Sequence, residues 1–377
     1  MDDRGTVLQI STMVPPARYG GAELVVGSFG EQLERAGFRV HNQGLKARHD
    51  DGSGLPIANL YWPFDGRDHG TAQRLVWHAI DALTLSARAA VERLVDEVDP
   101  DVMVTHNLRG WGLAPWVVAE QRRIPLVHMI HDYGLLCNAS TLWHKGSDCK
   151  DSHNPCRLRA RAAARRWRGG LLIGNSYAVL TEHRRRGFGT ASPSAVVHPV
   201  MAGQELSPGS RQRTNGLPAT FGYLGRLTAE KGIDLLLDAI AGTGKHLVVA
   251  GDDETSQAQL LKERAPGQVQ WHGWMEPGPF LDAIDVLVVP SAWREPFGLV
   301  VVEAARAGVP VLLADQPGLI EAARVSGARY KAFPANDRQA LRAALGLPLS
   351  HYRTEVAPAP DSDIVDQVSR LARAGRR

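Results

Sequence analysis

Two glutamates eight positions apart, Glu295 and Glu303, could face opposite ends of one bound ligand. The apolar run 285 to 290 before them predicts a short buried strand, and the residues after Gly298 predict a helix that ends near Gly308. A helix that starts behind a strand attracts anions, because its first backbone N–H groups are unpaired. At about 1.5 Å per residue, Glu303 would lie roughly 7 Å further along than the helix start. A diphosphate-linked sugar would fit between the two carboxylates.

A second charged group stands upstream, where a predicted strand ends in a glycine turn. Gly225 is followed by Arg226, and Lys231 comes just before the helix expected over 233 to 241. Lysine serves as a compact charge for phosphate, whereas arginine can grip two oxygens. Two cations at one strand end therefore indicate a phosphate site. The alternative is an ordinary solvated helix start, in which Lys231 pairs with Glu230.

Together these two elements resemble the retaining nucleotide-sugar glycosyltransferases of family 4, the glycosyl transferases group 1, which carry an E-x7-E element in this strand, loop and helix context. The resemblance implies that Glu295 meets sugar hydroxyls and that Glu303 binds the ribose hydroxyls. It also implies that the backbone amides of Phe297, Gly298 and Leu299 cradle the sugar and the phosphate. An isolated E-x7-E would more often be two solvated glutamates beside an ordinary helix.

The resemblance makes Arg226 and Lys231 the diphosphate clamp that stabilises the leaving group, with Gly225 beside them in the donor site. In the family, the segment after the glycine of a later strand abuts the nucleobase. His272 and Trp274 are therefore candidates for contact with the base, although an aromatic residue in a strand more often belongs to the core.

One loop departs from the pattern of the family. Gln316-Pro-Gly318 stands where the family usually has a Gly-Gly pair before its glutamate, here Glu321. The sugar or phosphate contacts of that loop are therefore not predicted. The resemblance otherwise spans most of residues 5 to 345, and it is more specific in the second half.

In the N-terminal half the resemblance assigns a histidine and a glycine pair. His131-Asp132 matches a His-Asp motif of the family, which implies that His131 lies beside the transferred sugar and that Asp132 has a supporting role. Elsewhere a histidine at a strand end is more often structural. Gly20 and Gly21 match a Gly-Gly pair near the donor phosphates and the acceptor, and without a Cβ they allow the backbone to approach a ligand.

Strands and helices alternate in both halves, which predicts parallel sheets. Ligands of such sheets bind beyond the carboxyl ends of strands, where Gly251, Gly273 and Ser291 are expected. With the resemblance, the predicted α/β fold is GT-B: two Rossmann-like, doubly wound parallel-sheet domains that face each other across a cleft. There is no G-x-G-x-x-G after the first strand and no Walker-type lysine loop, which argues against a dinucleotide oxidoreductase and a nucleoside triphosphatase.

The chain of 377 residues, 44% of them hydrophobic, is long enough for two cores. We expect an acceptor-binding domain over 1–200, a nucleotide-sugar donor domain over 201–350, and a segment 351–377 that returns to the first domain. Pro199 to Pro218 reads as the linker. No apolar run approaches ~20 residues and no signal pattern begins the chain, so a cytoplasmic location is expected. Residues 42 to 70 form an acceptor loop or irregular surface.

Arginines cluster in one segment, although the net charge of the chain is only +3. Six of them, between Arg157 and Arg168, alternate with alanines in a predicted helix. Such a face could rest on anionic lipid at the inner face of the membrane, or it could receive an anionic acceptor. The alternative is a solvated face in an arginine-rich protein.

All three cysteines, Cys137, Cys149 and Cys156, fall within twenty residues and near His153. Three thiolates and an imidazole could hold a structural zinc ion, but the spacing lacks a C-x-x-C pair. A disulfide is disfavoured in a reducing cytoplasm. Catalysis needs no metal or other cofactor, because a helix dipole with Arg226 and Lys231 can balance the diphosphate charge.

The function predicted from this pattern is transfer of a sugar from a nucleotide diphosphate to an acceptor hydroxyl, with retention at the anomeric carbon, in glycan, polysaccharide or glycoconjugate biosynthesis. Glu295 would orient the sugar and is not assigned as a base. Two alternatives share the fold, namely a nucleotide-sugar epimerase and a non-catalytic binder of nucleotide sugars. The Gly-Arg and Lys partners of E-x7-E argue against the epimerase, and the presence of both His131 and Glu295 argues against the non-catalytic binder.

Overall fold

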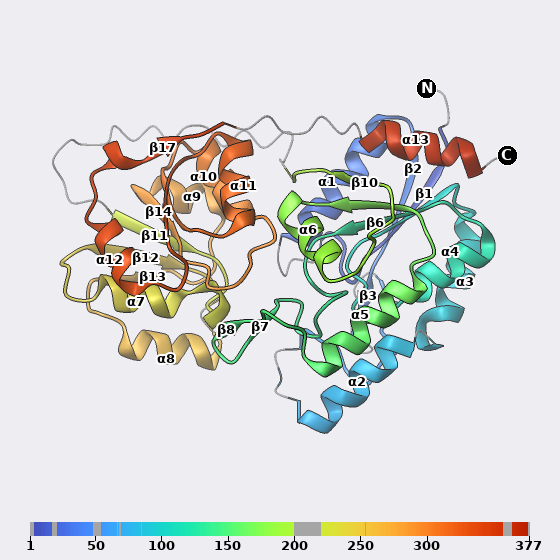
Figure 1. Cartoon of the computed structure of the whole chain (residues 1–377), viewed down its shortest axis with the longest axis horizontal. Helices are drawn as coiled ribbons and strands as arrows, with labels where there is room; N and C mark the ends of the chain where they lie inside the picture. Colours follow the sequence, from blue (N-terminus) through green and yellow to red (C-terminus); the bar gives the residue numbers. More distant parts are fainter. Residues whose placement is uncertain are drawn as a thin grey trace. The chain divides into compact units, whose positions relative to one another are not determined.

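The computed structural model describes residues 4–16, 21–47, 54–65, 67, 69–83, 85–199, 220–252, 254–356 and 364–375. The chain divides into two compact units, and Figure 1 labels most of their helices and strands. Unit 1 comprises Met1–Ser140, Asp151–Met201 and Pro360–Arg377, and unit 2 comprises Thr141–Lys150 and Ala202–Ala359. The linker expected over 199 to 218 lies, apart from Pro199, outside the described residues.

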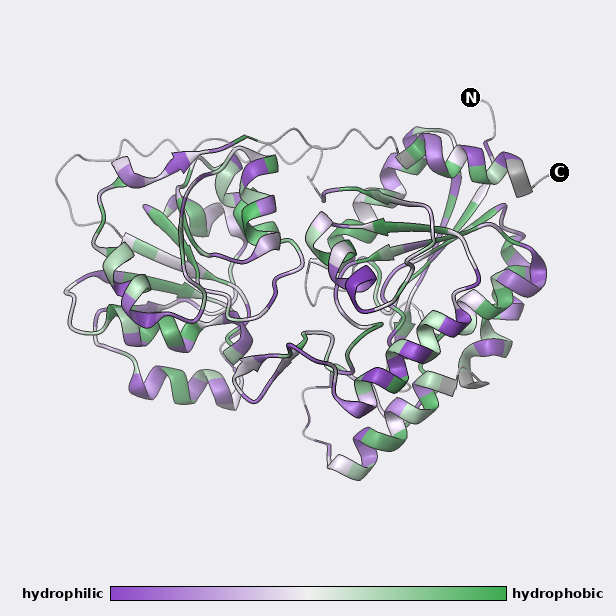
Figure 2. Cartoon of the chain, viewed as in Figure 1, coloured by the Kyte–Doolittle hydropathy of each residue, from purple (hydrophilic) through white to green (hydrophobic). Residues whose placement is uncertain are grey.

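Unit 1 is built on a six-stranded parallel sheet in the order β10-β9-β6-β5-β1-β2. Its central strands are short, mainly apolar runs with every residue buried, as strands covered on both faces require (Figure 2). The strands are β1 (Thr6–Ile10), β2 (Arg39–Gln43), β5 (Val102–Thr105), β6 (Leu126–Ile130), β9 (Leu171–Gly174) and β10 (Ser194–Val196). The helices are α1 (Ala22–Arg35), α2 (Thr71–Leu83), α3 (Leu85–Val98), α4 (Ala114–Arg122), α5 (Asn154–Arg166), α6 (Tyr177–Arg185) and α13 (Ile364–Gly375). A short parallel pair, β3 (Leu45–Lys46) with β4 (Leu55–Pro56), lies apart from this sheet.

Helix α13 belongs to unit 1, although it follows unit 2 in the sequence. Its residues Val368 and Ala372 are fully buried in a core that includes Phe29 and Leu33 of α1. The Arg4 guanidinium, ahead of β1, donates to the Ser369 hydroxyl at 3.3 Å. The core of unit 1 is therefore made from both ends of the described chain.

Unit 2 holds a seven-stranded sheet in the order β13-β12-β11-β14-β15-β16-β17, parallel except for the last pair. The strands are β11 (Thr220–Leu224), β12 (His246–Ala250), β13 (Val269–Trp271), β14 (Val286–Val289), β15 (Val311–Ala314), β16 (Arg329–Phe333) and β17 (Arg353–Thr354). The helices are α7 (Ile233–Ile240), α8 (Ser256–Arg264), α9 (Pro277–Asp282), α10 (Leu299–Arg306), α11 (Pro317–Ser326) and α12 (Arg338–Leu345), with 3₁₀ turns η1 (Ala229–Lys231) and η2 (Leu349–His351). A hairpin of β7 (Trp143–His144) and β8 (Ser147–Asp148) joins unit 2 through the Arg294 to Asp148 ion pair, 2.7 Å long.

The strand order reverses once in each sheet, between β1 and β5 in unit 1 and between β11 and β14 in unit 2. This is the doubly wound arrangement, so the predicted Rossmann-like architecture is confirmed in both units. Ligands of such sheets bind at the reversal, outside the carboxyl ends of the strands. In the part of the chain that the structure describes, no helix is both long enough and apolar enough to cross a bilayer.

Replacing Val368 by alanine should destabilise unit 1 by about 2 kcal/mol, because the change leaves a cavity under α13. Amide hydrogen exchange should accelerate in α1 and β5 peptides and stay unchanged in β14 peptides of unit 2. Arg370→Ala, at a side chain 79% exposed on the same helix, is the matched control. Equal exchange in the two variants would mean that α13 does not support the core.

Candidate active site

The carboxylate of Glu295 is the centre of the site in unit 2. It is buried in the loop after β14, where Lys231 Nζ lies 2.8 Å from both carboxylate oxygens. The Ser291 hydroxyl and the Trp293 indole N–H donate to Oε2 at 3.0 and 2.9 Å. Burial alone would raise the pKa of Glu295, but the Lys231 charge and these hydrogen bonds hold it below the ordinary value. Glu295 is therefore an anion at neutral pH.

Lys231 reaches Glu295 from the other side of the strand reversal. It ends the 3₁₀ turn η1 after β11, and the Glu230 carbonyl in that turn accepts the backbone N–H groups of Ala292 and Trp293 at 2.9 and 3.2 Å. The Lys231 ammonium also lies over the Trp293 ring, 5.0 Å from its centre. The loops after β11 and β14 are thus joined through both backbone and side chains.

The two predicted phosphate-binding cations each have a carboxylate partner. Lys231 pairs with Glu295, and Arg226 lies 3.5 Å from Glu230. The alternative from the sequence, a pair between Lys231 and Glu230, is wrong, because Glu230 pairs with Arg226. Since the Arg226 side chain is 41% exposed, its pair with Glu230 is weak and can be exchanged for a ligand.

Helix α10 begins at Leu299, as the sequence predicted, and Gly298 is its N-cap. Gly298 has φ +90°, a conformation that side chains rarely adopt, and no side chain caps the helix. Gly318, in the loop that departs from the family pattern, packs against this turn, where a Cβ would lie 2.1 Å from the Glu295 carbonyl oxygen. Neither glycine can be replaced without moving the backbone next to Glu295.

Glu303 lies on α10 in a partly buried position. Burial is the main cause that raises its pKa to about 7; the Arg306 charge opposes this shift, and the nearby Glu276 charge adds to it. Glu303 therefore changes its charge near neutral pH, unlike Glu295. This difference gives the two glutamates of the motif distinct chemistry.

Three glycines meet at the carboxyl ends of adjacent strands, as expected. The N–H of Gly225 donates to Ala250 O at 3.0 Å, and that of Gly251 donates to Gly273 O at 2.8 Å. His272 and Trp274 flank this edge, and Trp274 is 63% exposed. Both aromatic side chains are accessible to a ligand, and their contact with a base stays a prediction.

In unit 1, His131 is buried directly after β6, with His106 Nδ1 2.9 Å from its Nε2. Burial lowers the pKa of His131 to about 4, so its ring is neutral. Asp132 Oδ1 accepts the backbone N–H of Gly134 at 2.6 Å and so holds the turn. Gly21 is the N-cap of α1, whereas Gly20 lies outside the described residues.

Sequence reasoning assigned no role to Trp293 or to His106. The position of Trp293, in the loop between the end of β14 and Glu295, was a signal for the first. For the second, the signal was a histidine after each of two neighbouring strands, His106 and His131. Each unit holds its own group of predicted site residues.

The structure does not support the zinc hypothesis. Among the described residues, which include Cys137, Cys149, Cys156 and His153, no group of three or more His, Cys, Asp or Glu side chains is arranged to hold a metal ion. Cys137 and Cys149 are buried like small apolar residues.

The prediction of one basic face on α5 needs a correction at Arg159. This arginine pairs with the buried Asp81 of α2 at 2.9 Å and also donates to the Gly134 carbonyl. Asp81 in turn accepts the Gly110 N–H at 2.7 Å. Arg159 therefore joins α5 to the body of unit 1, and it is not available to a membrane.

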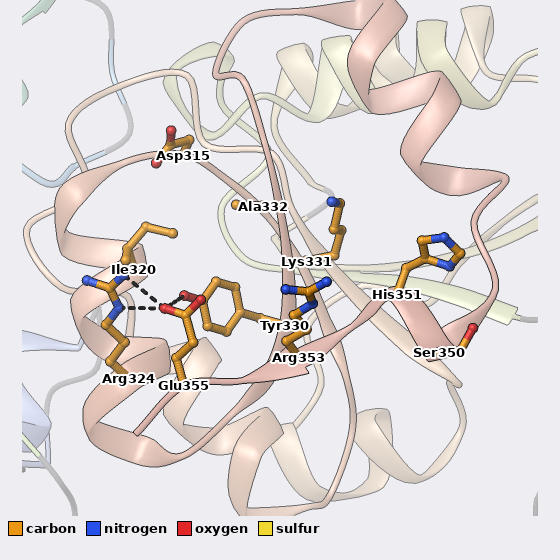
Figure 3. Close-up of a pocket in the computed structure, with 10 residues that line it drawn as sticks. All are labelled: Asp315, Ile320, Arg324, Tyr330, Lys331, Ala332, Ser350, His351, Arg353 and Glu355. Atoms are coloured by element: carbon orange, nitrogen blue, oxygen red, sulfur yellow. Dashed lines mark hydrogen bonds and ion pairs between the residues drawn. The ribbon is translucent and has the colours of Figure 1, made fainter. Parts of the chain in front are cut away.

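A cavity of about 680 Å³ lies elsewhere in unit 2, along β16, β17 and α11 (Figure 3). Glu355 in its wall accepts hydrogen bonds from Arg324 and from the Tyr330 hydroxyl. None of the predicted site residues lines this cavity. The candidate site is therefore defined by the loops at the strand reversal and not by this cavity.

Comparison with known proteins gives matches over nearly the whole chain. A model for Glycosyltransferase Family 4 matches residues 19–200, and a model for Glycosyl transferases group 1 matches residues 210–349. An uncharacterized 42.6 kDa protein in the cps region of Klebsiella pneumoniae is 26% identical, over 85% of this chain and 87% of that protein. A D-inositol 3-phosphate glycosyltransferase of Corynebacterium jeikeium is 27% identical, over 80% of this chain and 76% of that protein. The crystal structure of Anabaena Alr3699/HepE in complex with UDP-glucose has a TM-score of 0.62 at 18% identity, over 99% of this chain and 93% of that one.

Replacing Lys231 by methionine should destabilise unit 2 by about 3 kcal/mol at pH 8, because it leaves the Glu295 charge buried without its cation. In the native protein the pKa of Glu295 is lower than in the unfolded chain, where it is near 4.3. The ionised carboxylate therefore stabilises the fold at any pH above about 4.3, and this contribution is lost as the pH falls through the folded pKa. In the variant burial raises that pKa, so protonation at low pH removes the penalty.

The difference in thermal stability between native protein and variant should therefore narrow as the pH falls from 8 to about 5. The control is Lys231→Met with Glu295→Gln, which removes both charges and should show a smaller loss of stability without the pH dependence. A gap that stays constant with pH in the single variant would contradict the proposed electrostatic link.

Proposed function

The chain belongs to the group 1 glycosyltransferases of family 4, and from this we propose that it is a retaining enzyme that moves a sugar from a nucleotide diphosphate to an acceptor hydroxyl. The observation that carries the proposal is the Lys231–Glu295 pair, held at the strand reversal of unit 2 beside the start of α10. Unit 2 binds the nucleotide diphosphate of the donor in this proposal, and unit 1 binds the acceptor.

The two carboxylate oxygens of Glu295 accept different numbers of hydrogen bonds from the protein. Oε2 accepts from Lys231, Ser291 and Trp293, whereas Lys231 is the one donor to Oε1 in the described residues. A carboxylate oxygen has about two acceptor positions, so Oε1 retains capacity for a sugar hydroxyl. Glu295 thus orients the sugar and does not act as a base.

The Lys231 ammonium is placed to bridge the sugar and phosphate ends of the donor. It has three N–H donors, and two are directed at the Glu295 oxygens. The third can bind a phosphate oxygen. Arg226 adds a second cation by exchanging its contact with Glu230 for the diphosphate, and the N–H groups at the start of α10 complete the anion site.

In the reaction the bond between the anomeric carbon and the leaving phosphate oxygen breaks, and the acceptor oxygen bonds to that carbon on the same face. The acceptor proton passes to the leaving phosphate oxygen, so no protein base is required. The cations stabilise the charge that develops on the leaving group. Glu303 accepts hydrogen bonds from the ribose hydroxyls, and Trp274 and His272 contact the base.

The biological setting that we propose is assembly of a glycan, polysaccharide or glycoconjugate. The family membership and the relative from a cps region support this setting. The acceptor is then a hydroxyl of a growing glycan or of its carrier.

Calorimetric titration with UDP-, GDP-, dTDP- and ADP-sugars should reveal binding of one nucleotide class, weakened severalfold or more in Glu303→Gln. Because the pKa of Glu303 is about 7, the native protein should bind this donor about tenfold more weakly at pH 6 than at pH 8, and the variant should lack this difference. Glu276→Gln is the control, since it removes a like charge and should move the transition to lower pH.

NMR of the first sugar anomer released by slow hydrolysis of the bound donor tests retention. An inverted anomer would refute the retaining mechanism. No binding of any of the four classes would refute the nucleotide-sugar donor, and equal binding by Glu303→Gln would remove Glu303 from the site.

Helix α5 supports a peripheral contact with an anionic membrane. Arg157, Arg161 and Arg165 are exposed and recur every four residues, so they share one face. Leu158 beside them is 66% exposed, and Leu75 and Val76 on the linked helix α2 are exposed as well. Figure 2 shows hydrophobic residues among the hydrophilic ones on both helices. Cations next to exposed apolar side chains suit the surface of an anionic bilayer.

The protein should cosediment with anionic liposomes at low salt and dissociate as salt is added. Arg161→Glu with Arg165→Glu should weaken the partition about 30-fold or more, at about 1 kcal/mol for each cation removed. Arg35→Glu with Arg370→Glu, at exposed positions elsewhere in unit 1, is the charge-matched control. No binding at low salt, or an equal loss in both variants, would rule out this face.

A further inference from the structure

A row of buried hydrogen bonds crosses the sheet of unit 1 over three adjacent strands. Gln9 on β1 lies with its Oε1 2.8 Å from His106 Nε2, just after β5. His106 Nδ1 lies 2.9 Å from His131 Nε2, just after β6. All three side chains are buried, and the two imidazole rings stack 5.1 Å apart. The row therefore links the carboxyl-terminal part of β1 to the predicted sugar-side histidine.

A backbone carbonyl fixes the direction of this row. The Gln9 amide donates from Nε2 to Val26 O at 3.4 Å and to Asn42 Oδ1 at 2.7 Å. A carbonyl oxygen only accepts, so the Gln9 nitrogen faces Val26 and its oxygen faces His106. His106 Nε2 must then carry a hydrogen and donate it to Gln9.

The same reasoning passes from His106 to His131. Burial keeps His106 neutral, with its pKa well below the ordinary value, so its Nδ1 carries only a lone pair. His131 therefore donates its Nε2 hydrogen to His106, and its own Nδ1 is left without a hydrogen. The Nδ1 atom of His131 is an acceptor.

This acceptor has no partner in the part of the chain that the structure describes. His131 Nδ1 is a buried atom without a hydrogen bond among the described residues, and so is the side-chain oxygen of Asn175. Asn175 Nδ2 donates to the His131 carbonyl at 3.3 Å, which fixes its oxygen as an acceptor too. The two residues follow adjacent strands, because Ile130 of β6 pairs with Gly174 of β9.

Two buried acceptors without donors are costly, because burial removes them from bulk water. Their cost is relieved by a ligand that supplies hydroxyl hydrogens. We infer that Gln9 and His106 hold His131 in its Nε2–H tautomer, so that His131 Nδ1 and Asn175 Oδ1 form an acceptor-only subsite for the hydroxyl hydrogens of a polyhydroxylated ligand. The inference rests on the proposed function in one respect, because there the ligand is a sugar.

Gln9 and His106 are positioning residues in this arrangement. They touch the ligand only through His131, and they set which of its ring nitrogens can accept. Gly30 of α1 makes room for them, because a Cβ there would lie 2.9 Å from Gln9 Nε2. A donor sugar that lacks the matching hydroxyl would leave an acceptor buried and unpaired.

Nitrogen-15 NMR of histidine-labelled protein tests the tautomer without any substrate, with the His131 signal assigned by its loss in His131→Gln. The native protein should show a hydrogen on His131 Nε2 and none on Nδ1. Gln9→Glu places a carboxylate at His106, so that His106 holds a second proton and donates from Nδ1. The hydrogen on His131 should then move to Nδ1.

His128 controls for folding in this experiment, because its Nδ1 bonds to Thr105 Oγ1 at 2.9 Å, apart from the row. Its signal should stay unchanged in Gln9→Glu. A native His131 that carries its hydrogen on Nδ1 would overturn the inference, as would a variant in which the His128 signal is kept and the His131 tautomer does not move.

Deoxyfluoro analogues of the donor sugar test the subsite, since fluorine fills the space of a hydroxyl but supplies no hydrogen. At one sugar position, the native protein should lose about 10- to 100-fold in kcat/KM with the analogue. The loss should shrink to about threefold or less in Gln9→Glu, whose His131 no longer accepts at Nδ1, while the variant turns over the natural donor more slowly.

An equal response to every analogue would overturn the subsite. Failure of the proposed function gives a different result, namely no binding of any nucleotide sugar by a protein whose His131 tautomer is as inferred.

Discussion

The loops of unit 2 are organised by the burial of one charged group, the Glu295 carboxylate. A buried anion is tolerated only when hydrogen-bond donors and a cation surround it. Lys231, Ser291 and Trp293 meet this requirement, and Lys231 does so from the loop after a different strand. The position of β11 relative to β14 is thereby coupled to the start of α10. Gly318 then has to be a glycine, because the backbone of this turn leaves no space for a Cβ.

Unit 1 also buries polar side chains next to its sheet, but these side chains are neutral. Gln9, His106 and His131 are buried and polar, and they satisfy one another by a directed row of hydrogen bonds in place of an ion pair. Because a neutral imidazole offers one donor and one acceptor, the order of hydrogens along the row follows from a single anchored amide. In the function that we propose, the charged site binds anionic groups of the ligand and the neutral site binds hydroxyl hydrogens.

Features set by neighbours in the sequence were predictable. The short strands, the helix start at Gly298 and the glycines at strand ends follow from local patterns of apolar residues, glycine and proline. The Lys231–Glu295 pair joins residues 64 positions apart, and their local patterns do not reveal which carboxylate a lysine will meet. For the same reason, the closeness of the three cysteines in sequence did not establish a metal site among the described residues.

Distance in sequence also hid two features of the units. Residues of the β7–β8 hairpin lie within the N-terminal half yet join unit 2, because Arg294 pairs with Asp148. Arg159 looked like one member of a basic stripe, but its position on the inner side of α5 brings it to the buried Asp81. Periodicity identifies a helix more readily than it identifies the partner of each side chain.

The position of helix α13 in the sequence determines when the core of unit 1 can be completed during synthesis. The ribosome synthesises β1 and α1 first and α13 only after the described strands and helices of unit 2. The apolar surface around Phe29 and Leu33 therefore stays uncovered until α13 has been made. During translation the first unit to begin is therefore the last to be completed. Until then, the apolar face of unit 1 that α13 later covers is available for cellular chaperones to bind.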